Sequence, residues 1–118
     1  MQLKNDINSH NLLDETIFNY YQKNGNRHLS NFLHTEDSEC NAFDTYFLID
    51  RKHVIRYGIS QDREFWLGAV SLAIGPHYFG ASDFWSYENS DRFTLEATTE
   101  GVEHNLKLLD EFLGYTNI

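Results

Sequence analysis

The 118-residue chain has very little cysteine and proline and no long apolar run. It has one cysteine, Cys40, so no disulfide can form within the chain, and it has one proline. The longest apolar run, at residues 65–75, falls well short of the roughly 20 residues that a membrane-spanning helix needs. The first fifteen residues lack the basic region and apolar stretch of a secretory signal. We therefore expect a cytoplasmic protein with neither a disulfide framework nor a membrane anchor.

The chain is rich in apolar and aromatic residues. Hydrophobic residues make up 41% of it and aromatic residues 15%, which is far too much for a disordered tail. A chain of this length can bury one sizeable core without disulfides or metals. We expect residues 1–118 to form a single domain.

Basic residues are the scarcest charged class, and the net charge is −9. Residues 1–50 hold eight acids and three bases, residues 51–81 two acids and four bases, and residues 82–118 eight acids and two bases. Such a field repels phosphate backbones and anionic lipid headgroups, so it argues against nucleic acid or membrane as the direct ligand. It favours a basic protein partner, although acidity can also serve solubility alone.

Helices are predicted near both ends of the chain. Asn11 can cap a first helix with apolar residues at helical spacing, and this helix ends before Gly25. The clearest helix follows Thr98 or Thr99 and ends at Gly114, with Val102, Leu106, Leu109 and Leu113 along one face. Asp110 and Glu111 near its carboxyl end oppose the helix dipole, which is a local cost.

Between the helices the period of the apolar residues changes to two. Residues 43–49 and 53–59 alternate around a turn at 50–52 and predict an antiparallel hairpin. The apolar segment at residues 64–76 could be a buried strand or a buried helix, and its glycines, rings and β-branched residues favour a central strand covered on both faces. Residues 84–87 are interpreted as a short strand, and residues 92–97 as a half-buried strand on which Phe93, Leu95 and Ala97 share a face. Residues 29–33 suggest one helical turn, and residues 75–82 a loop.

This order of elements predicts an α+β fold. We expect an antiparallel sheet of about four to five strands, with the N- and C-terminal helices packed on it.

No motif in the sequence names a reaction. Cys40 lies among carboxylates that disfavour its thiolate, and no histidine pair has metal-ligand spacing. Phosphate-binding glycine motifs are also missing. The basic cluster Arg51, Lys52, Arg56 and Arg63 is best read as neutralising nearby acids. We therefore predict no catalytic residue, no metal site and no cofactor, and a protein that is not an enzyme.

Residues 82–93, SDFWSYENSDRF, combine aromatic rings with an excess of carboxylates. Desolvated aromatic anchors surrounded by charges are typical of protein contact sites, where the charges steer a partner of opposite sign. The competing reading makes the rings ordinary core residues. The predicted partner-binding residues are Asp83, Trp85, Tyr87, Glu88 and Asp91, with Glu100 and Glu103 as rim charges.

The small size, the acidic excess and the ending SDFWSYENSDRFTLEATTEGVEHNLKLLDEFLGY resemble the immunity proteins of bacterial polymorphic toxin and contact-dependent growth inhibition systems. The resemblance covers most of the chain and lies in these general features rather than in a short motif. It implies a cytoplasmic protein that binds and neutralises a cognate toxin domain, often a basic nuclease.

Two other functions stay open at the level of sequence. One is a small enzyme or ligand-binding domain with a pocket lined by Phe65, Trp66, Tyr78 and Phe79. A deep pocket, or a histidine and a carboxylate brought together by the fold, would favour it. The other is an adaptor that uses the same acidic surface for a different partner.

Overall fold

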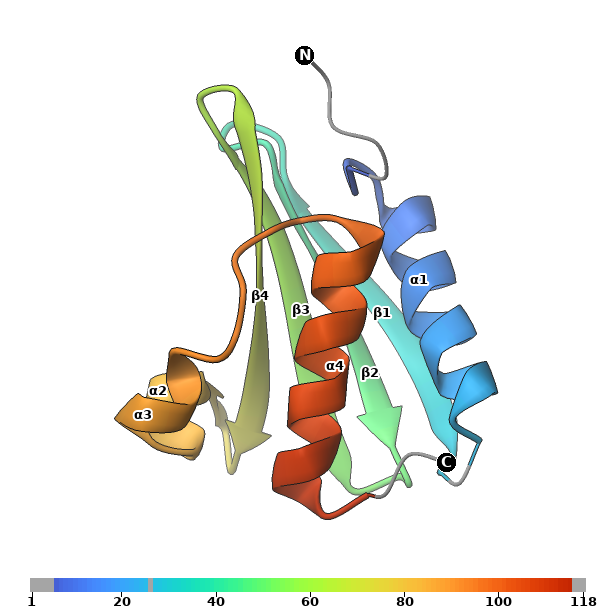
Figure 1. Cartoon of the computed structure of the whole chain (residues 1–118). Coiled ribbons are helices and arrows are strands. Elements are labelled where there is room, and N and C mark those ends of the chain that lie inside the picture. Colours follow the sequence, from blue (N-terminus) through green and yellow to red (C-terminus); the bar gives the residue numbers. More distant parts are fainter. Residues whose placement is uncertain (1–5, 26, 116–118) are drawn as a thin grey trace.

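A computed structural model of the chain describes residues 6–25 and 27–115. Its elements, in chain order, are α1 (His10–Lys23), β1 (Leu29–Asp37), β2 (Ala42–Ile49), β3 (His53–Asp62), β4 (Phe65–Ile74), β5 (His77–Gly80), α2 (Ala81–Phe84), α3 (Tyr87–Ser90) and α4 (Thr99–Leu113). The five strands form one antiparallel sheet, and helices from both ends of the chain pack on it (Figure 1). The predicted α+β fold is confirmed.

The sheet is a simple meander in which each strand pairs with the next, in the order β1-β2-β3-β4-β5. The predicted hairpin of β2 and β3 is present, with Phe47 opposite Ile55 and Thr45 opposite Tyr57. These four side chains lie fully buried beneath the helices, because alternate residues of a strand point to opposite faces. Asp50 turns the chain between the strands with a left-handed φ of 54°.

The long helices α1 and α4 cover one face of the sheet and leave the other open (Figure 1). Ser9, rather than Asn11, caps α1, with its hydroxyl accepting from the backbone N–H of Leu12. Thr98 caps α4, and Gly114 ends it in the left-handed conformation, as predicted. None of the described helices has the length and apolarity needed to cross a membrane.

The prediction of a helical turn at residues 29–33 is wrong, because these residues belong to β1. The pairing of β1 with β2 shifts between Ser30 and Leu33, so the two-residue alternation is interrupted there. Phe32 packs on the core ring of Phe47, and Leu33 lies 66% exposed on the open face. Because of this irregularity, the apolar residues of β1 follow the spacing expected of a helical turn rather than the two-residue period of a strand.

Residues 76–97 differ most from the predictions. The predicted loop at 75–82 contains β5, and the predicted strand at 84–87 is instead the end of α2 and the start of α3. Residues 92–97 form no regular strand, and Leu95 is 61% exposed, whereas Ala97 is buried. The expected burial of β4 on both faces is also wrong, since Phe65 is 65% exposed.

Residues 92–97 bond the backbone of the sheet only through Leu95 and Glu96 within the described chain, and one buried residue takes the place of a strand partner at Thr94. The fully buried side chain of Asn105 in α4 bonds both backbone groups of Thr94: its Oδ1 accepts from the Thr94 N–H at 2.9 Å, and its Nδ2 donates to the Thr94 carbonyl at 2.8 Å. The same Nδ2 donates to the hydroxyl of Tyr57 in the sheet. A side chain thus takes the place of a neighbouring strand.

Candidate partner-binding surface

Residues 81–92 form a projection beside the β4 and β5 end of the sheet (Figure 1). Phe84 anchors it, since this ring is buried and lies 5.0 Å from that of Phe112 in α4. The Ser86 hydroxyl accepts from the backbone N–H of Asn89 and so caps the single turn α3. These two contacts fix which side chains the projection exposes.

The two central rings have different roles. Trp85 is half-buried, with its ring 5.4 Å from Phe112 and with the Arg92 guanidinium stacked over it at 5.5 Å. Tyr87 is 77% exposed, more than any other large hydrophobic residue described as exposed. Tyr87 is therefore free to act as an aromatic anchor, whereas Trp85 holds the projection against α4.

Three carboxylates surround Tyr87 in the sequence of the projection: Asp83, Glu88 and Asp91, all exposed. We call Tyr87 and these three acids the knob. Within the described residues no Lys or Arg forms an ion pair with any of the three. The negative charge of the knob is thus open to a partner.

The nearest cation in the sequence, Arg92, bonds residues other than the acids of the knob. It donates to Glu111 in α4 at 2.8 and 3.1 Å and to Asn89 at 2.9 Å. This hydrogen-bonded pair raises the pKa of Arg92 and lowers that of Glu111. Glu111, which opposes the helix dipole, therefore has a compensating partner.

The predicted rim charges do not join the knob. Glu100 lies in the first turn of α4, eleven positions before Glu111, which corresponds to about 16 Å along a helix. Glu103 pairs with Lys23 of α1 at 3.6 Å. The structure thus gathers Asp83, Tyr87, Glu88 and Asp91 and separates them from the two acids of α4.

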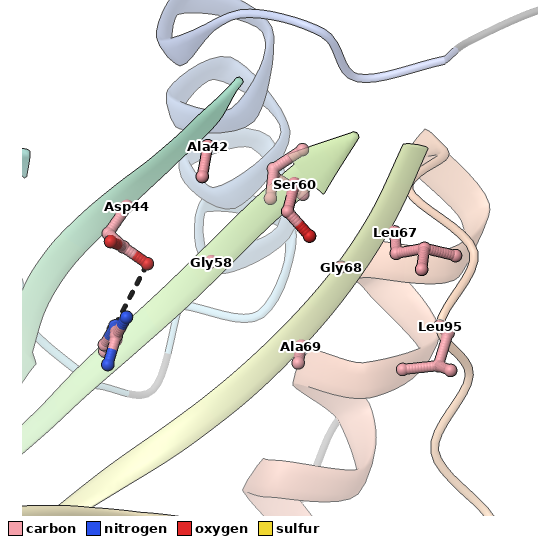
Figure 2. Close-up of a pocket in the computed structure, with 10 residues that line it drawn as sticks. Ala42, Asp44, Gly58, Ser60, Leu67, Gly68, Ala69 and Leu95 are labelled. Carbon is pink, nitrogen blue, oxygen red and sulfur yellow. Dashed lines mark hydrogen bonds and ion pairs between the residues drawn. The ribbon is translucent and has the colours of Figure 1, made fainter. Parts of the chain in front are cut away.

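The open face of the sheet carries a shallow hollow of about 330 Å³ that the sequence did not reveal (Figure 2). Its floor is made of small residues, with Gly58 and Ala69 on neighbouring strands. On one side Arg56 donates to Asp44 at 3.0 Å, and on the other Leu67 and Leu95 form an apolar wall. A Cβ on Gly58 would lie 2.6 Å from Asp44 Oδ1, so glycine leaves room for this pair.

The pocket predicted for a small ligand does not form. Phe65 and Tyr78 lie on the open face of the sheet, but Trp66 and Phe79 pack against the core on the opposite face. The four rings therefore do not line one cavity.

A cluster of histidines and carboxylates joins α1 to the first two strands. His34 Nε2 donates to Asp14 Oδ2 at 2.6 Å, and the other oxygen of Asp14 accepts from the Thr45 hydroxyl at 2.9 Å. The ring of His10 lies 4.5 Å from that of His34 and contacts Glu36 at 3.0 Å. No group of three or more such side chains among the described residues could hold a metal ion.

A buried ion pair connects the loop after α1 to α4. Arg27 donates to Asp110, and the two side chains are 0% and 1% exposed. The guanidinium also stacks over the rings of Tyr21 and Tyr115, at 5.1 and 5.2 Å. The position of Asp110 against the helix dipole was the one sequence signal that a cation would be needed here.

Cys40 lies exposed in the turn between β1 and β2, where its thiol contacts Asp37. This hydrogen bond and the charge of Asp37 raise the pKa of the thiol, in the direction that the sequence predicts.

No protein-family model, no curated protein and no solved structure matches the chain.

Proposed function

We propose that the chain is a cytoplasmic immunity protein that binds a cognate toxin domain with a basic surface, using the knob as the central contact. The observation that carries this proposal is the exposed ring of Tyr87 among three carboxylates that have no cationic partner in the described part of the chain. Exposed aromatic anchors are costly in water and contribute most when a partner desolvates them.

The charge of the knob suits a toxin that acts on nucleic acid. A nuclease presents a basic cleft shaped for phosphates, and acidic groups around an aromatic ring can occupy such a cleft. Long-range attraction would raise the association rate, and burial of Tyr87 would slow dissociation. The protein would then block the cleft without performing chemistry of its own.

The test begins with co-expression of the chain and the C-terminal domain of a large secreted protein encoded directly upstream, scored by growth of a sensitive host. Survival only in the presence of the chain supports the proposal. Equal death with and without it contradicts the proposal. Binding rates are then measured with purified toxin domain at low and high salt.

A matched pair of triple variants separates local contact from overall charge. Asp83→Lys, Glu88→Lys and Asp91→Lys together should lower the association rate by 10-fold or more at low salt, because attraction by the knob becomes repulsion. Glu15→Lys, Glu39→Lys and Glu64→Lys change the net charge equally at exposed sites outside the knob. If the two triple variants bind alike, the knob is not the contact.

Trp85→Ala and Tyr87→Ala should differ in what they damage. Loss of the exposed Tyr87 ring should speed dissociation from the toxin and leave the melting temperature of the free protein nearly unchanged. Loss of Trp85 should lower the melting temperature, because this ring packs on Phe93 and Phe112.

A second candidate, a small enzyme or ligand-binding domain, is favoured by the pair formed by His34 and Asp14. A histidine oriented by a fixed carboxylate can use its other nitrogen as a base, and among the described residues no hydrogen bond reaches His34 Nδ1. A thermal-shift screen of small metabolites against the wild type and His34→Gln tests it. A compound that stabilises only the wild type would favour this function over toxin binding.

A further inference from the structure

A second cavity lies between the knob and the open face of the sheet. Strand β5 ends at Gly80, opposite Ser71 of β4, and further along the chain Leu95 and Glu96 bond the backbone of β4 at Gly68 and Leu67. Between these contacts no described strand pairs with β4 on this side. The resulting cavity has a volume of about 400 Å³, and we call it the Asp91 groove.

Small residues, hydroxyl-bearing residues and a carboxylate line the Asp91 groove. Small residues, including Gly68, Ala69 and Ala81, leave room for a side chain to lie along it. Hydroxyl groups come from Ser71, Ser82, Ser90 and Thr94, and among the described residues of the lining Asp91 is the only carboxylate. Such a site suits a ligand with a slender apolar stem and a cationic, hydrogen-bonding head.

The electrostatics of the groove also call for a cation from outside. Asp91 is exposed and belongs to the knob, and the neighbouring cation, Arg92, is held by Glu111 and Asn89. Tyr87, four positions earlier, begins the turn α3 that Asp91 ends, and its ring is exposed. A guanidinium can bond a carboxylate through two N–H groups and stack on an aromatic face at the same time.

We propose that the Asp91 groove receives an arginine side chain of the partner protein. The aliphatic stem lies along the floor at Ala69, and the guanidinium meets Asp91, the serine hydroxyls and the ring of Tyr87. Lysine fits less well, because its ammonium is a compact charge that cannot form the planar fork. This inference rests on the proposed function for the identity of the partner but not for the chemistry of the groove.

The hollow on the open face extends the groove. The two cavities share Gly68, Ala69 and Leu95 in their linings. Leu95 therefore lies between the carboxylate of the groove and the apolar wall that it forms with Leu67 in the hollow, across from the pair of Arg56 and Asp44. A partner loop that places an arginine in the groove sets its next side chain against Leu67 and Leu95.

The test uses N-acetyl-arginine amide as the probe, titrated into isotopically labelled protein and followed by amide chemical shifts. N-acetyl-citrulline amide has nearly the same shape without the charge and serves as the control ligand. We expect the arginine probe to shift the amide signals of Ala69, Ser82, Ser90, Asp91 and Leu95, with at least 10-fold weaker binding of citrulline. Equal binding of the two probes, or shifts spread evenly over the acidic surface, would overturn the proposal.

Two variants sharpen the result. Asp91→Asn should weaken binding of the arginine probe by 10-fold or more, whereas Glu64→Gln, at an exposed acid outside the groove, should leave it unchanged. Ser82→Trp fills the groove from its exposed rim and should abolish the shifts at Ala69 and Leu95. If Asp91→Asn and Glu64→Gln lose the same affinity, the probe senses only net charge and the groove is not its site.

Failure of this inference can be told apart from failure of the proposed function. If the lysine substitutions in the knob abolish toxin neutralisation but Ser82→Trp does not, the function stands and the groove assignment is wrong. If the arginine probe binds in the groove but no toxin domain is neutralised, the groove assignment stands and the function is wrong.

Discussion

Gly101 offers a prediction in which two physical effects have opposite signs. It occupies the first turn of α4, where alanine would favour the helix by about 1 kcal/mol relative to glycine. However, a Cβ at this position would lie 2.3 Å from the carbonyl oxygen of Glu96. This is roughly 1 Å shorter than an ordinary carbon–oxygen contact of about 3.3 Å.

The clash should win over the helix preference. The contacted atom belongs to backbone whose neighbours are fixed: Glu96 bridges to Leu67 of β4, and the Ala97 carbonyl accepts from the Ile7 N–H at 2.7 Å. Overpacking of this kind costs about 1–3 kcal/mol or more, so we expect Gly101→Ala to lower the free energy of unfolding by about 2 kcal/mol. For a domain of this size that is roughly 6–12 °C in melting temperature.

Urea denaturation followed by tryptophan fluorescence and far-ultraviolet circular dichroism measures the difference. Lys107→Ala and Lys107→Gly, at an exposed position of the same helix, provide the matched control, and there the alanine variant should be more stable by about 1 kcal/mol. A Gly101→Ala protein more stable than the wild type would refute the reasoning. It would mean that residues 93–97 can move away from α4 at little cost.

Three further predictions concern buried and titrating groups. Arg27→Met should cost about 3–5 kcal/mol in urea denaturation, because it removes the guanidinium that pairs with the buried carboxyl of Asp110. Replacing Asp110 by Leu in the same protein should recover part of this loss, the rest being the hydrogen bond that the Tyr20 hydroxyl donates to Asp110, and no recovery would contradict the ion-pair account. Partial burial lowers the pKa of His53 below its usual 6.5, so the folded state binds its proton less readily than the unfolded state. The contribution of neutral His53 to stability is therefore present above about pH 6.5 and is lost as the pH falls. Between pH 7 and pH 5 the free energy of unfolding should fall more in the wild type than in His53→Gln. Equal falls in the two proteins would contradict this account. Asn105→Leu should cost about 3 kcal/mol, because the N–H and carbonyl of Thr94 and the buried hydroxyl of Tyr57 all lose this partner. Rapid hydrogen exchange of the Thr94 amide should accompany the loss, and an unchanged exchange rate would contradict the account.

The regular parts of the fold could be predicted because their patterns repeat. Burial alternates from Phe43 to Ile49 in β2 and from Ile55 to Ile59 in β3, and the residues with the largest apolar surface share the face that the helices cover. Helix α4 has a capping threonine, a terminal glycine and an apolar stripe between them. In such segments local preference and tertiary packing agree.

The irregular parts could not be predicted, because their structure depends on partners distant in the chain. The bulge in β1 changes the face of Leu33 by inserting a residue, which a two-residue period does not show. Residues 92–97 have the pattern of a strand, but the side chain of Asn105 satisfies Thr94, so they need no strand partner. At residues 84–87 the cap at Ser86 outweighs the strand preference of the aromatic residues.

The candidate site was predicted in composition but not in shape. The sequence identified the acids and rings of residues 82–93, and the structure exposes Tyr87 while using Trp85 for packing. The predicted rim acids, Glu100 and Glu103, share the charge of the knob but lie elsewhere on α4. Neither the hollow nor the Asp91 groove was visible in the sequence, since both arise where small residues of separate segments meet.

The way in which β5 joins the sheet determines how easily the candidate site can open locally. This strand is held to the sheet by only four residue pairs, and the single turns α2 and α3 follow it directly. Elements with few paired residues open at lower free energy than the centre of a sheet. We expect amide protons of β5 and the knob to exchange by local opening, well before those of β2 and β3. The region that would meet a partner can therefore adjust its shape while the rest of the domain stays folded.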